Sequence, residues 1–200
     1  MLPQRKIVLA STSPRRVQLL KQLGVAFECF SPNVLENCVN SDPVQRVKEN
    51  AEKKIRSAMP QYRDAVIIAA DTIVYYEGVI FEKPKDSEDA IKMLTTLSGK
   101  THIVFSAVMV LDSLSGCNRV EVEKTSVKMK SLSQQEIFSY VSKGEPMDKA
   151  GAYAAQGFGA ILLECISGCF YNVVGLPLPL LYDMLKGFEI NLLTDNKSYP

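Results

Sequence analysis

The sequence contains no tryptophan and only one histidine, His102, among its 200 residues. A single histidine cannot build a histidine metal site, and a Ser-His-Asp triad would depend entirely on this residue. Because His102 stands beside Thr101 in a strand-like run, we expect it to have a structural role. Any catalysis must therefore rest on other side chains.

The five cysteines show neither the paired spacing of a zinc site nor an even framework for disulfides. We interpret them as reduced thiols, as in a cytosolic protein. The first residues contain no long apolar segment, because Pro3, Gln4, Arg5 and Lys6 interrupt it. We therefore expect no signal peptide, and we expect a cytoplasmic location.

Neither sign of charge is in excess, since 23 Lys and Arg residues face 22 Asp and Glu residues. A net charge of +1 gives no global field that would attract nucleic acid or an anionic membrane. The apolar stretch 158–185 is broken by Glu164, Gly168 and Pro177, so it does not predict a membrane span. We expect no nucleic-acid or membrane partner, and any basic site must be local.

The first informative segment is 6–16, where the apolar run Ile7–Ala10 is followed by hydroxyl residues, Pro14 and two arginines. Ser13 suits an N-cap and Pro14 suits the first helical position. Helix N-termini attract anions, and arginine matches phosphate geometry. One interpretation is a phosphate site; an ordinary capped helix with solvated arginines fits the local pattern at least as well. The phosphate-site residues would be Ser11, Ser13, Arg15 and Arg16.

Strand-like and helical patterns alternate along the chain, with a hairpin at 73–81 and a long strand pair at 101–111 and 120–129. This order predicts an α/β fold with a mixed twisted sheet flanked by helices, rather than a purely parallel one. Helices are expected to begin after Ser13, Asp42, Ser87 and Ser133 and at Pro177, and 160–166 is expected as a strand or short buried helix. We expect one domain over 1–200 with a frayed tail at 194–200.

Polar clusters follow several of the strand-like runs. The apolar run 65–70 is expected to end in Asp71-Thr72, and Glu82-Lys83-Pro84 closes the hairpin. Ligands of α/β sheets bind outside the carboxyl ends of strands. Asp71 is therefore a candidate base or metal-binding carboxylate, although an aspartate in this position can equally cap a turn.

Several lysines and arginines would lie close together if these polar clusters share one cleft, and this would indicate the kind of ligand bound there. Cations with a few carboxylates, and without useful histidine or cysteine, are typical of phosphate chemistry with a hard metal ion such as Mg²⁺ or Mn²⁺. The alternative is that Lys54 and Lys149 are solvated surface lysines. The candidate cations are Arg15, Arg16, Lys54, Lys83 and Lys149, with Glu36, Asp71 and Asp148 as counter-charges.

Seven short motifs, in order along nearly the whole chain, resemble the Maf family of nucleoside triphosphate pyrophosphatases. They are Leu9-Ala10-Ser11-Thr12-Ser13-Pro14-Arg15-Arg16, Ala70-Asp71-Thr72-Ile73-Val74, Glu82-Lys83-Pro84, Leu97-Ser98-Gly99-Lys100-Thr101-His102, Gly144-Glu145-Pro146-Met147-Asp148-Lys149-Ala150-Gly151, Gln156-Gly157 and Asn172-Val173-Val174-Gly175-Leu176-Pro177.

The resemblance implies two lobes around a central cleft, as in Maf and ITPase folds, and a homodimer. It implies cleavage between the α and β phosphates with a divalent metal, Mg²⁺ or Mn²⁺. The motifs resemble the branch acting on dTTP and UTP, with modified pyrimidine nucleotides as further candidates. By position, Asp71 matches the proton acceptor, and Glu36 matches an acidic residue that would share the metal with it. The polar cleft positions match Ser11, Arg15, Arg16, Lys54 and Lys83, and those linked to base selectivity match Arg15, Thr72 and Gln156.

Several alternatives stay open at this point. Lys53 is a second candidate for the role of Lys54, and Asp71 is either the base or a metal ligand. Lys149 is expected to bind substrate together with Ser13. A non-catalytic nucleotide-binding regulator of cell division would use the same pocket, and a nucleic-acid-binding module is disfavoured by the near-zero net charge.

Overall fold

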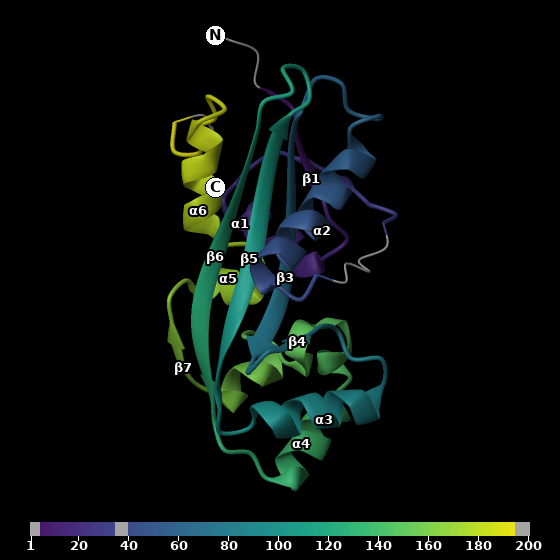
Figure 1. Ribbon diagram of the computed structural model, residues 1–200. Coiled ribbons are helices and arrows are strands. Elements are labelled where there is room, and N and C mark those ends of the chain that lie inside the picture. The colour runs from purple at the N-terminus through teal and green to yellow at the C-terminus, as the bar shows by residue number, and fades with distance from the viewer. Residues whose placement is uncertain (1–4, 35–39, 195–200) are drawn as a thin grey trace. The chain divides into compact units, whose positions relative to one another are not determined.

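The computed structural model of the chain describes residues 5–34 and 40–194 and divides into two compact units. Unit 1 comprises Met1–Asp71, Ala107–Val122 and Gly175–Pro200, and unit 2 comprises Thr72–Ser106 and Glu123–Val174. Figure 1 shows the helices and strands along the chain.

The described residues form a seven-stranded mixed sheet in the order β2-β1-β3-β5-β6-β7, with β4 paired to β3, which confirms the expected α/β class. Five main helices and several short ones accompany the strands. In chain order the elements are β1 (Ile7–Ala10), α1 (Pro14–Gln22), β2 (Glu28–Phe30), α2 (Pro43–Ala58), β3 (Val66–Tyr76), β4 (Val79–Phe81), α3 (Ser87–Leu97), β5 (Thr101–Asp112), β6 (Asn118–Met129), α4 (Gln134–Val141), the 3-10 helices η1 (Glu145–Asp148), η2 (Ala150–Ala152) and η3 (Gly157–Leu162), β7 (Leu163–Ser167), α5 (Phe170–Val174) and α6 (Leu178–Lys186).

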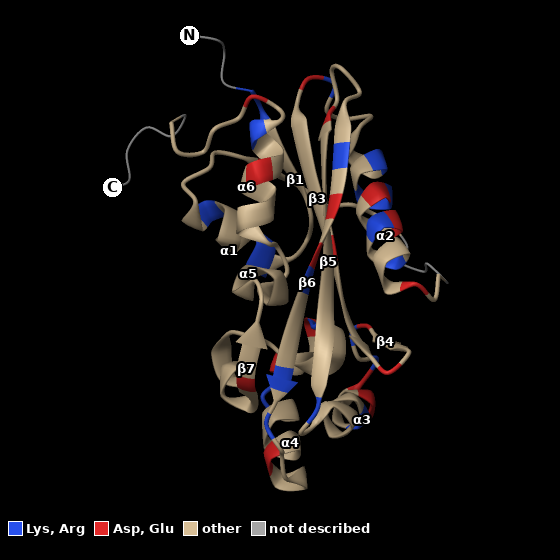
Figure 2. Ribbon diagram, turned by 60° about the vertical axis from the view of Figure 1, so that its left-hand side comes forward, with Lys and Arg blue, Asp and Glu red and all other residues tan. Residues whose placement is uncertain are grey.

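In unit 1, β1 pairs in parallel with both β2 and β3, with Val8 opposite Glu28 on one side and Ile67 on the other. Helix α2 lies on one side of these strands, and α1 and α6 lie on the other (Figure 2). The run Ala65–Ala70 is completely buried, as expected for a strand that is covered on both faces.

Helix α2 begins where the sequence predicts, because the Asp42 side chain accepts a hydrogen bond from the Val44 N–H and Pro43 takes the first helical position. Its buried residues recur every three or four positions, and they are Val47, Asn50, Ala51, Lys54, Ile55 and Ala58. This spacing defines one helix face. Two polar side chains, Asn50 and Lys54, are therefore carried on the face that packs inward.

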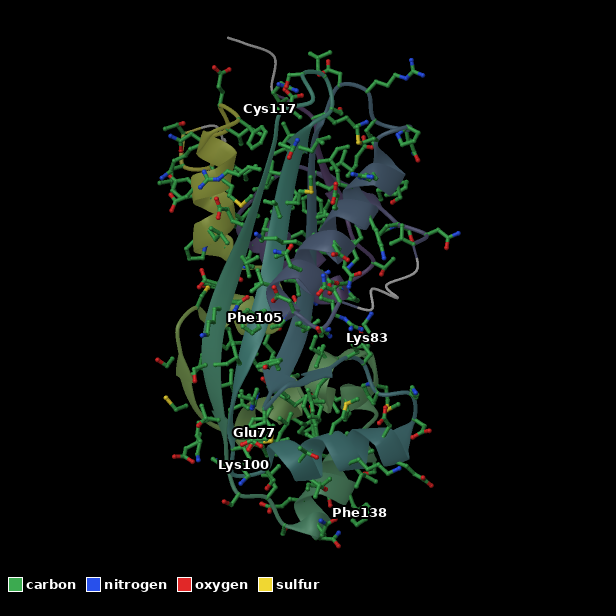
Figure 3. All side chains as sticks on the ribbon, in the orientation of Figure 1. Glu77, Lys83, Lys100, Phe105, Cys117 and Phe138 are labelled. Atoms are coloured by element: carbon green, nitrogen blue, oxygen red, sulfur yellow. The ribbon has the colours of Figure 1, made fainter. Side chains whose placement is uncertain are left out.

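In unit 2, the end of β3 and β4 form the expected antiparallel hairpin, with Val74 opposite Phe81 and Tyr76 opposite Val79. The two turn residues, Glu77 (labelled in Figure 3) and Gly78, both have positive φ, at 45° and 85°. Positive φ at both positions is typical of the two-residue turns that match the twist of a hairpin.

The core of unit 2 is formed by α3, α4 and the strands β5 and β6, and includes Leu94, Leu97, Val127, Met129 and Ile137. Strand β7 pairs antiparallel with β6 and has mostly exposed side chains. The predicted capping box of α4 is confirmed, since Ser133 and Glu136 each bond the other's backbone N–H.

Three predictions about element boundaries are wrong. Strand β3 does not end at Asp71-Thr72 but continues to Tyr76. Helix α3 is capped by Asp86, whose carboxylate accepts from the Asp89 N–H, so Ser87 is already helical. The segment 160–166 begins in a 3-10 helix, and only Leu163–Ser167 is a strand. Apart from Thr194, the expected frayed tail at 194–200 lies outside the described residues.

Candidate active site

Asp71 lies in the middle of the eleven-residue strand β3, and its exposed fraction is 5 %. The sequence suggests a strand that stops before a polar pair, because a charged residue normally ends an apolar run. Here the strand continues because the carboxylate has partners inside unit 1. Burying a carboxylate without such partners would be strongly unfavourable.

Lys54 and Asn50 on α2 are these partners. Lys54 Nζ lies 2.6 Å from Asp71 Oδ1 and 3.2 Å from the main-chain oxygen of Ala70. Asn50 Nδ2 donates to Asp71 Oδ2 at 3.0 Å. Both oxygens of the carboxylate therefore accept a hydrogen bond from the same face of the same helix.

Of the two candidate lysines, Lys53 and Lys54, it is Lys54 that the structure pairs with Asp71. Lys54 is 4 % exposed and bonds Asp71, whereas Lys53 is only half-buried. The interpretation of Lys54 as a solvated surface lysine is therefore wrong. Sequence reasoning missed Asn50, which is 2 % exposed and whose Oδ1 is buried without a partner among the described residues. Its position on the apolar stripe of α2, four residues before Lys54, is the signal that would have found it.

The turn between β1 and α1 carries the predicted phosphate-site residues. Ser11 is buried, and its Oγ accepts a hydrogen bond from the Ser13 N–H at 3.1 Å. Ser13 occupies the N-cap position, but its side chain makes no capping hydrogen bond, which differs from the prediction. The reason is local: the hydroxyl that bonds the backbone at this turn is that of Ser11.

The two arginines of α1 have different environments. Arg16 is 8 % exposed, and its Nε donates to the main-chain oxygen of Gly175 at 2.8 Å. Arg15 is half-buried. The interpretation of both as solvated arginines on a simple capped helix is therefore wrong for Arg16. Its guanidinium also fixes the start of the last segment of unit 1 against α1.

Unit 2 contains the other candidate residues. Thr72 follows Asp71 in β3 and is half-buried, and its Oγ1 lies 2.8 Å from Ser106 Oγ. Lys83 is exposed in the turn after β4 and is labelled in Figure 3. Lys149 is not a solvated lysine, because its Nζ donates to the main-chain oxygen of Glu145 at 2.7 Å and to Asp148 Oδ1 at 2.6 Å.

Gln156 is exposed and directly precedes η3, in a segment that Glu145 holds. The Glu145 carboxylate accepts from the N–H groups of Phe158 and Gly159, at 3.0 and 2.8 Å, and from the Tyr140 hydroxyl at 3.0 Å. Burial alone would raise the pKa of Glu145, but these three hydrogen bonds outweigh it and hold the pKa below its ordinary value.

Two glycines show how closely this segment is packed. A Cβ at Gly157, which has a φ of +66°, would lie 2.5 Å from Glu145 Oε2, and a Cβ at Gly159 would lie 2.4 Å from the main-chain oxygen of Ala154. Neither position accepts a side chain without local movement. The backbone next to Gln156 is therefore fixed by packing and by the Glu145 carboxylate.

His102 has the structural role that the sequence indicates. It is 1 % exposed, and its Nε2 lies 2.7 Å from the hydroxyl of Tyr153. Burial lowers its pKa to about 4 and raises the pKa of Tyr153 far above its ordinary value. The imidazole is therefore neutral at physiological pH.

A metal ion would find few protein ligands among the residues that the structure describes, which contain no group of three or more His, Cys, Asp or Glu side chains. Glu36 lies outside them. Mg²⁺ commonly binds through one or two carboxylates together with substrate phosphates. Asp71, with its oxygens held by Asn50 and Lys54, fits the part of one such carboxylate, but not a site built from protein ligands alone.

Of the predicted site residues, Ser11, Ser13, Arg15, Arg16, Lys54 and Asp71 belong to unit 1, and Thr72, Lys83, Lys149 and Gln156 belong to unit 2. Direct contacts join Lys54 to Asp71 and Ser11 to Ser13.

Across residues 5–34 and 40–194, no helix has both the length and the apolar character that crossing a membrane requires.

Comparison with known proteins places these features in a family. A protein of Dictyoglomus turgidum named dTTP/UTP pyrophosphatase is 48 % identical over 192 residues, covering 95 % of this chain and all of that protein. A protein of the same name from Aquifex aeolicus is 46 % identical over 188 residues, covering 94 % of this chain and 97 % of the relative. The described fold resembles the solved Ham1 protein of Staphylococcus aureus, with a TM-score of 0.52 and 16 % identity over 92 % of this chain and all of that one. This likeness concerns the fold alone. The family described as Maf-like protein matches residues 6–188, and the chain therefore belongs to the Maf family.

Proposed function

We propose that the protein is a nucleoside triphosphate pyrophosphatase that acts on dTTP and UTP, and on modified pyrimidine nucleotides as further candidates. It hydrolyses the bond between the α and β phosphates and releases the monophosphate and pyrophosphate. The observation that carries the proposal is the 48 % identity, over nearly the full length of both chains, with a relative named dTTP/UTP pyrophosphatase.

In this proposal Asp71 is the central catalytic residue. A buried ion pair contributes little net stability compared with apolar packing, so its presence inside β3 favours a chemical role. The carboxylate accepts a proton from the attacking water or is one of the ligands of a metal ion. Lys54 and Asn50 hold it in one orientation in either role.

The cationic side chains neutralise the triphosphate in this proposal. Arg15 and Arg16 lie in the first turn of α1, where main-chain N–H groups and the helix dipole also favour an anion. Lys83 contributes a further positive charge from an exposed turn, and Ser11, Ser13 and Lys149 complete the polar set. Charge neutralisation of this kind lowers the barrier to attack by water on phosphorus.

We also propose that a divalent cation, Mg²⁺ or Mn²⁺, arrives with the nucleotide. Asp71 would supply one carboxylate ligand and Glu36 the other, with phosphate oxygens completing the shell. The ion would neutralise charge on the phosphates. The homodimeric state, the cytoplasmic location and the absence of nucleic-acid and membrane partners are parts of the same proposal.

In this proposal Arg15, Thr72 and Gln156 recognise the pyrimidine base. Gln156 can both donate and accept, which suits the mixed donor and acceptor edge of uracil and thymine. A site that leaves buried polar groups unpaired with the wrong base discriminates against that base.

One assay separates this activity from its alternatives. The purified protein is incubated with each nucleoside triphosphate and Mg²⁺ or Mn²⁺, and pyrophosphate is measured. Release from dTTP and UTP supports the proposal. Binding of nucleotides without release would instead indicate a non-catalytic regulator, and affinity only for a polymer would indicate a nucleic-acid-binding module.

A further inference from the structure

A hydrogen bond between two hydroxyl groups joins β3 to β5 in unit 2. Thr72 Oγ1 lies 2.8 Å from Ser106 Oγ, and either oxygen can be the donor in this contact. Ser106 is completely buried, whereas Thr72 is half-buried. The bond thus links an inaccessible hydroxyl to Thr72, one of the three residues that the proposed function assigns to base recognition.

A second contact of Ser106 decides which of the two hydroxyls donates. Ser106 Oγ donates to the main-chain oxygen of Asn172 at 3.3 Å. A carbonyl oxygen has no proton to give, and a serine hydroxyl has only one. The proton between Thr72 and Ser106 must then belong to Thr72. Any other contact of Thr72 Oγ1 uses a lone pair, and this oxygen acts there as an acceptor.

The carbonyl group that orients Ser106 is itself held in place. Asn172 is completely buried in α5, and its Nδ2 donates to the main-chain oxygen of Val104 at 3.1 Å and to Thr125 Oγ1 at 2.9 Å. The Thr125 hydroxyl also bonds the backbone of Cys169. The segment that supplies the acceptor to Ser106 is therefore fixed at several points.

An acceptor at Thr72 has a direct consequence for the choice between pyrimidines. Uracil and thymine carry a hydrogen on N3, whereas cytosine has a lone pair there. An oxygen that can only accept a hydrogen bond can bond the N3–H of uracil or thymine. With cytosine, the same oxygen would face the N3 lone pair, and two acceptors would meet. We propose that Ser106 is a positioning residue for base specificity: it fixes the Thr72 hydroxyl as an acceptor and so favours uracil and thymine over cytosine. This inference rests on the proposed function.

The test compares kcat/KM for UTP and CTP in the native protein and in Ser106→Ala. Removing the buried hydroxyl frees the Thr72 proton to turn toward the nucleotide. We expect the UTP-to-CTP ratio to fall roughly five- to tenfold, the fold-change of about one hydrogen bond. Thr72→Val should lower the ratio similarly, and Ser106→Ala added to Thr72→Val should lower it no further. Thr72→Ser, which keeps the hydroxyl, should retain the native ratio.

Ser98→Ala is the control, because it deletes a half-buried hydroxyl of unit 2 that bonds the backbone of Leu132 and does not belong to the Thr72–Ser106–Asn172 network. It should leave the ratio at its native value. A ratio that Ser106→Ala leaves unchanged, or an equal loss on both nucleotides, would overturn the inference, as would a native protein that does not discriminate UTP from CTP. Absence of pyrophosphate release from UTP by the native protein would instead count against the proposed function.

Discussion

Lys54 Nζ lies 2.6 Å from Asp71 Oδ1, and the two side chains are only 5 % and 7 % exposed. Asn50 Nδ2 donates a hydrogen bond to the other carboxylate oxygen, Oδ2. An ion pair so far from water is tolerated only because each charge has a partner, and removal of either partner leaves an uncompensated charge in the interior. This dependence makes the pair accessible to experiment.

Replacing Lys54 with methionine should lower the free energy of unfolding by about 3–5 kcal/mol, because the Asp71 carboxylate then remains buried without its cation. Lys53→Met changes a neighbouring half-buried lysine and should stay within about 0.5 kcal/mol of the native value. Urea unfolding of the three proteins measures the difference. Equal stability of both variants would contradict a compensating role for Lys54.

Asp71→Asn should lower turnover of dTTP and UTP at least about a hundredfold, since the amide keeps an acceptor for Lys54 but cannot take up a proton. The fold should survive at reduced stability, because the Lys54 ammonium loses its counter-charge. Pyrophosphate release measures turnover, and circular dichroism checks the fold. Asp64→Asn, at an exposed position of unit 1, should retain native turnover. Near-native activity of a folded Asp71→Asn sample would remove this residue from the mechanism.

Gln156→Ala should reduce selectivity among nucleotides more than it reduces the maximal rate, because the side chain is expected to contact the base rather than the phosphates. The measurement is kcat/KM across dTTP, UTP and CTP. Gln135→Ala replaces another exposed glutamine of unit 2, on α4, and should leave the ratios unchanged. Unaltered ratios in Gln156→Ala itself would place the residue outside the base site.

The buried His102 predicts a specific pH dependence of stability. Its folded pKa is about 4, below the ordinary value of 6.5. Between these two pH values the unfolded chain binds a proton at His102 and the native state does not. The free energy of unfolding therefore falls as pH is lowered from 6.5 toward 4, in total by roughly 3 kcal/mol. His102 is the only histidine, so its NMR signal reports the folded pKa directly. A midpoint near 6.5, or an equally steep loss in His102→Gln, would contradict this account.

The sequence predicted those parts of the fold that local chemistry determines. Asp42 with Pro43, and Ser133 with Glu136, begin helices where expected, because caps satisfy backbone groups within a few residues. The start of α3 was misplaced because Asp86 and Ser87 are both good caps, and only the backbone conformation selects the first. The continuation of β3 through Asp71 was not predictable locally, since it depends on two residues of α2.

The candidate site was likewise predicted only where residue type and spacing along the sequence reveal it. Lys54 was among the candidate cations and also matched a cleft position by resemblance, but its burial could have been inferred from its place on the apolar stripe of α2. Asn50 shares that stripe and was missed because an isolated asparagine in a helix is usually exposed. Glu145 was missed as an organiser of the segment beside Gln156, because its partners are main-chain N–H groups that no residue pattern reveals.

The position of Asp71 inside an eleven-residue strand, rather than in a loop after one, has a mechanical meaning. A loop carboxylate must be immobilised each time a ligand arrives, and part of the binding free energy is lost to that ordering. In β3 the ordering is completed when the chain folds. Under the proposed function, the carboxylate is therefore preorganised before a nucleotide binds, and its reactivity should depend on the ligand that approaches it rather than on any rearrangement of its own backbone.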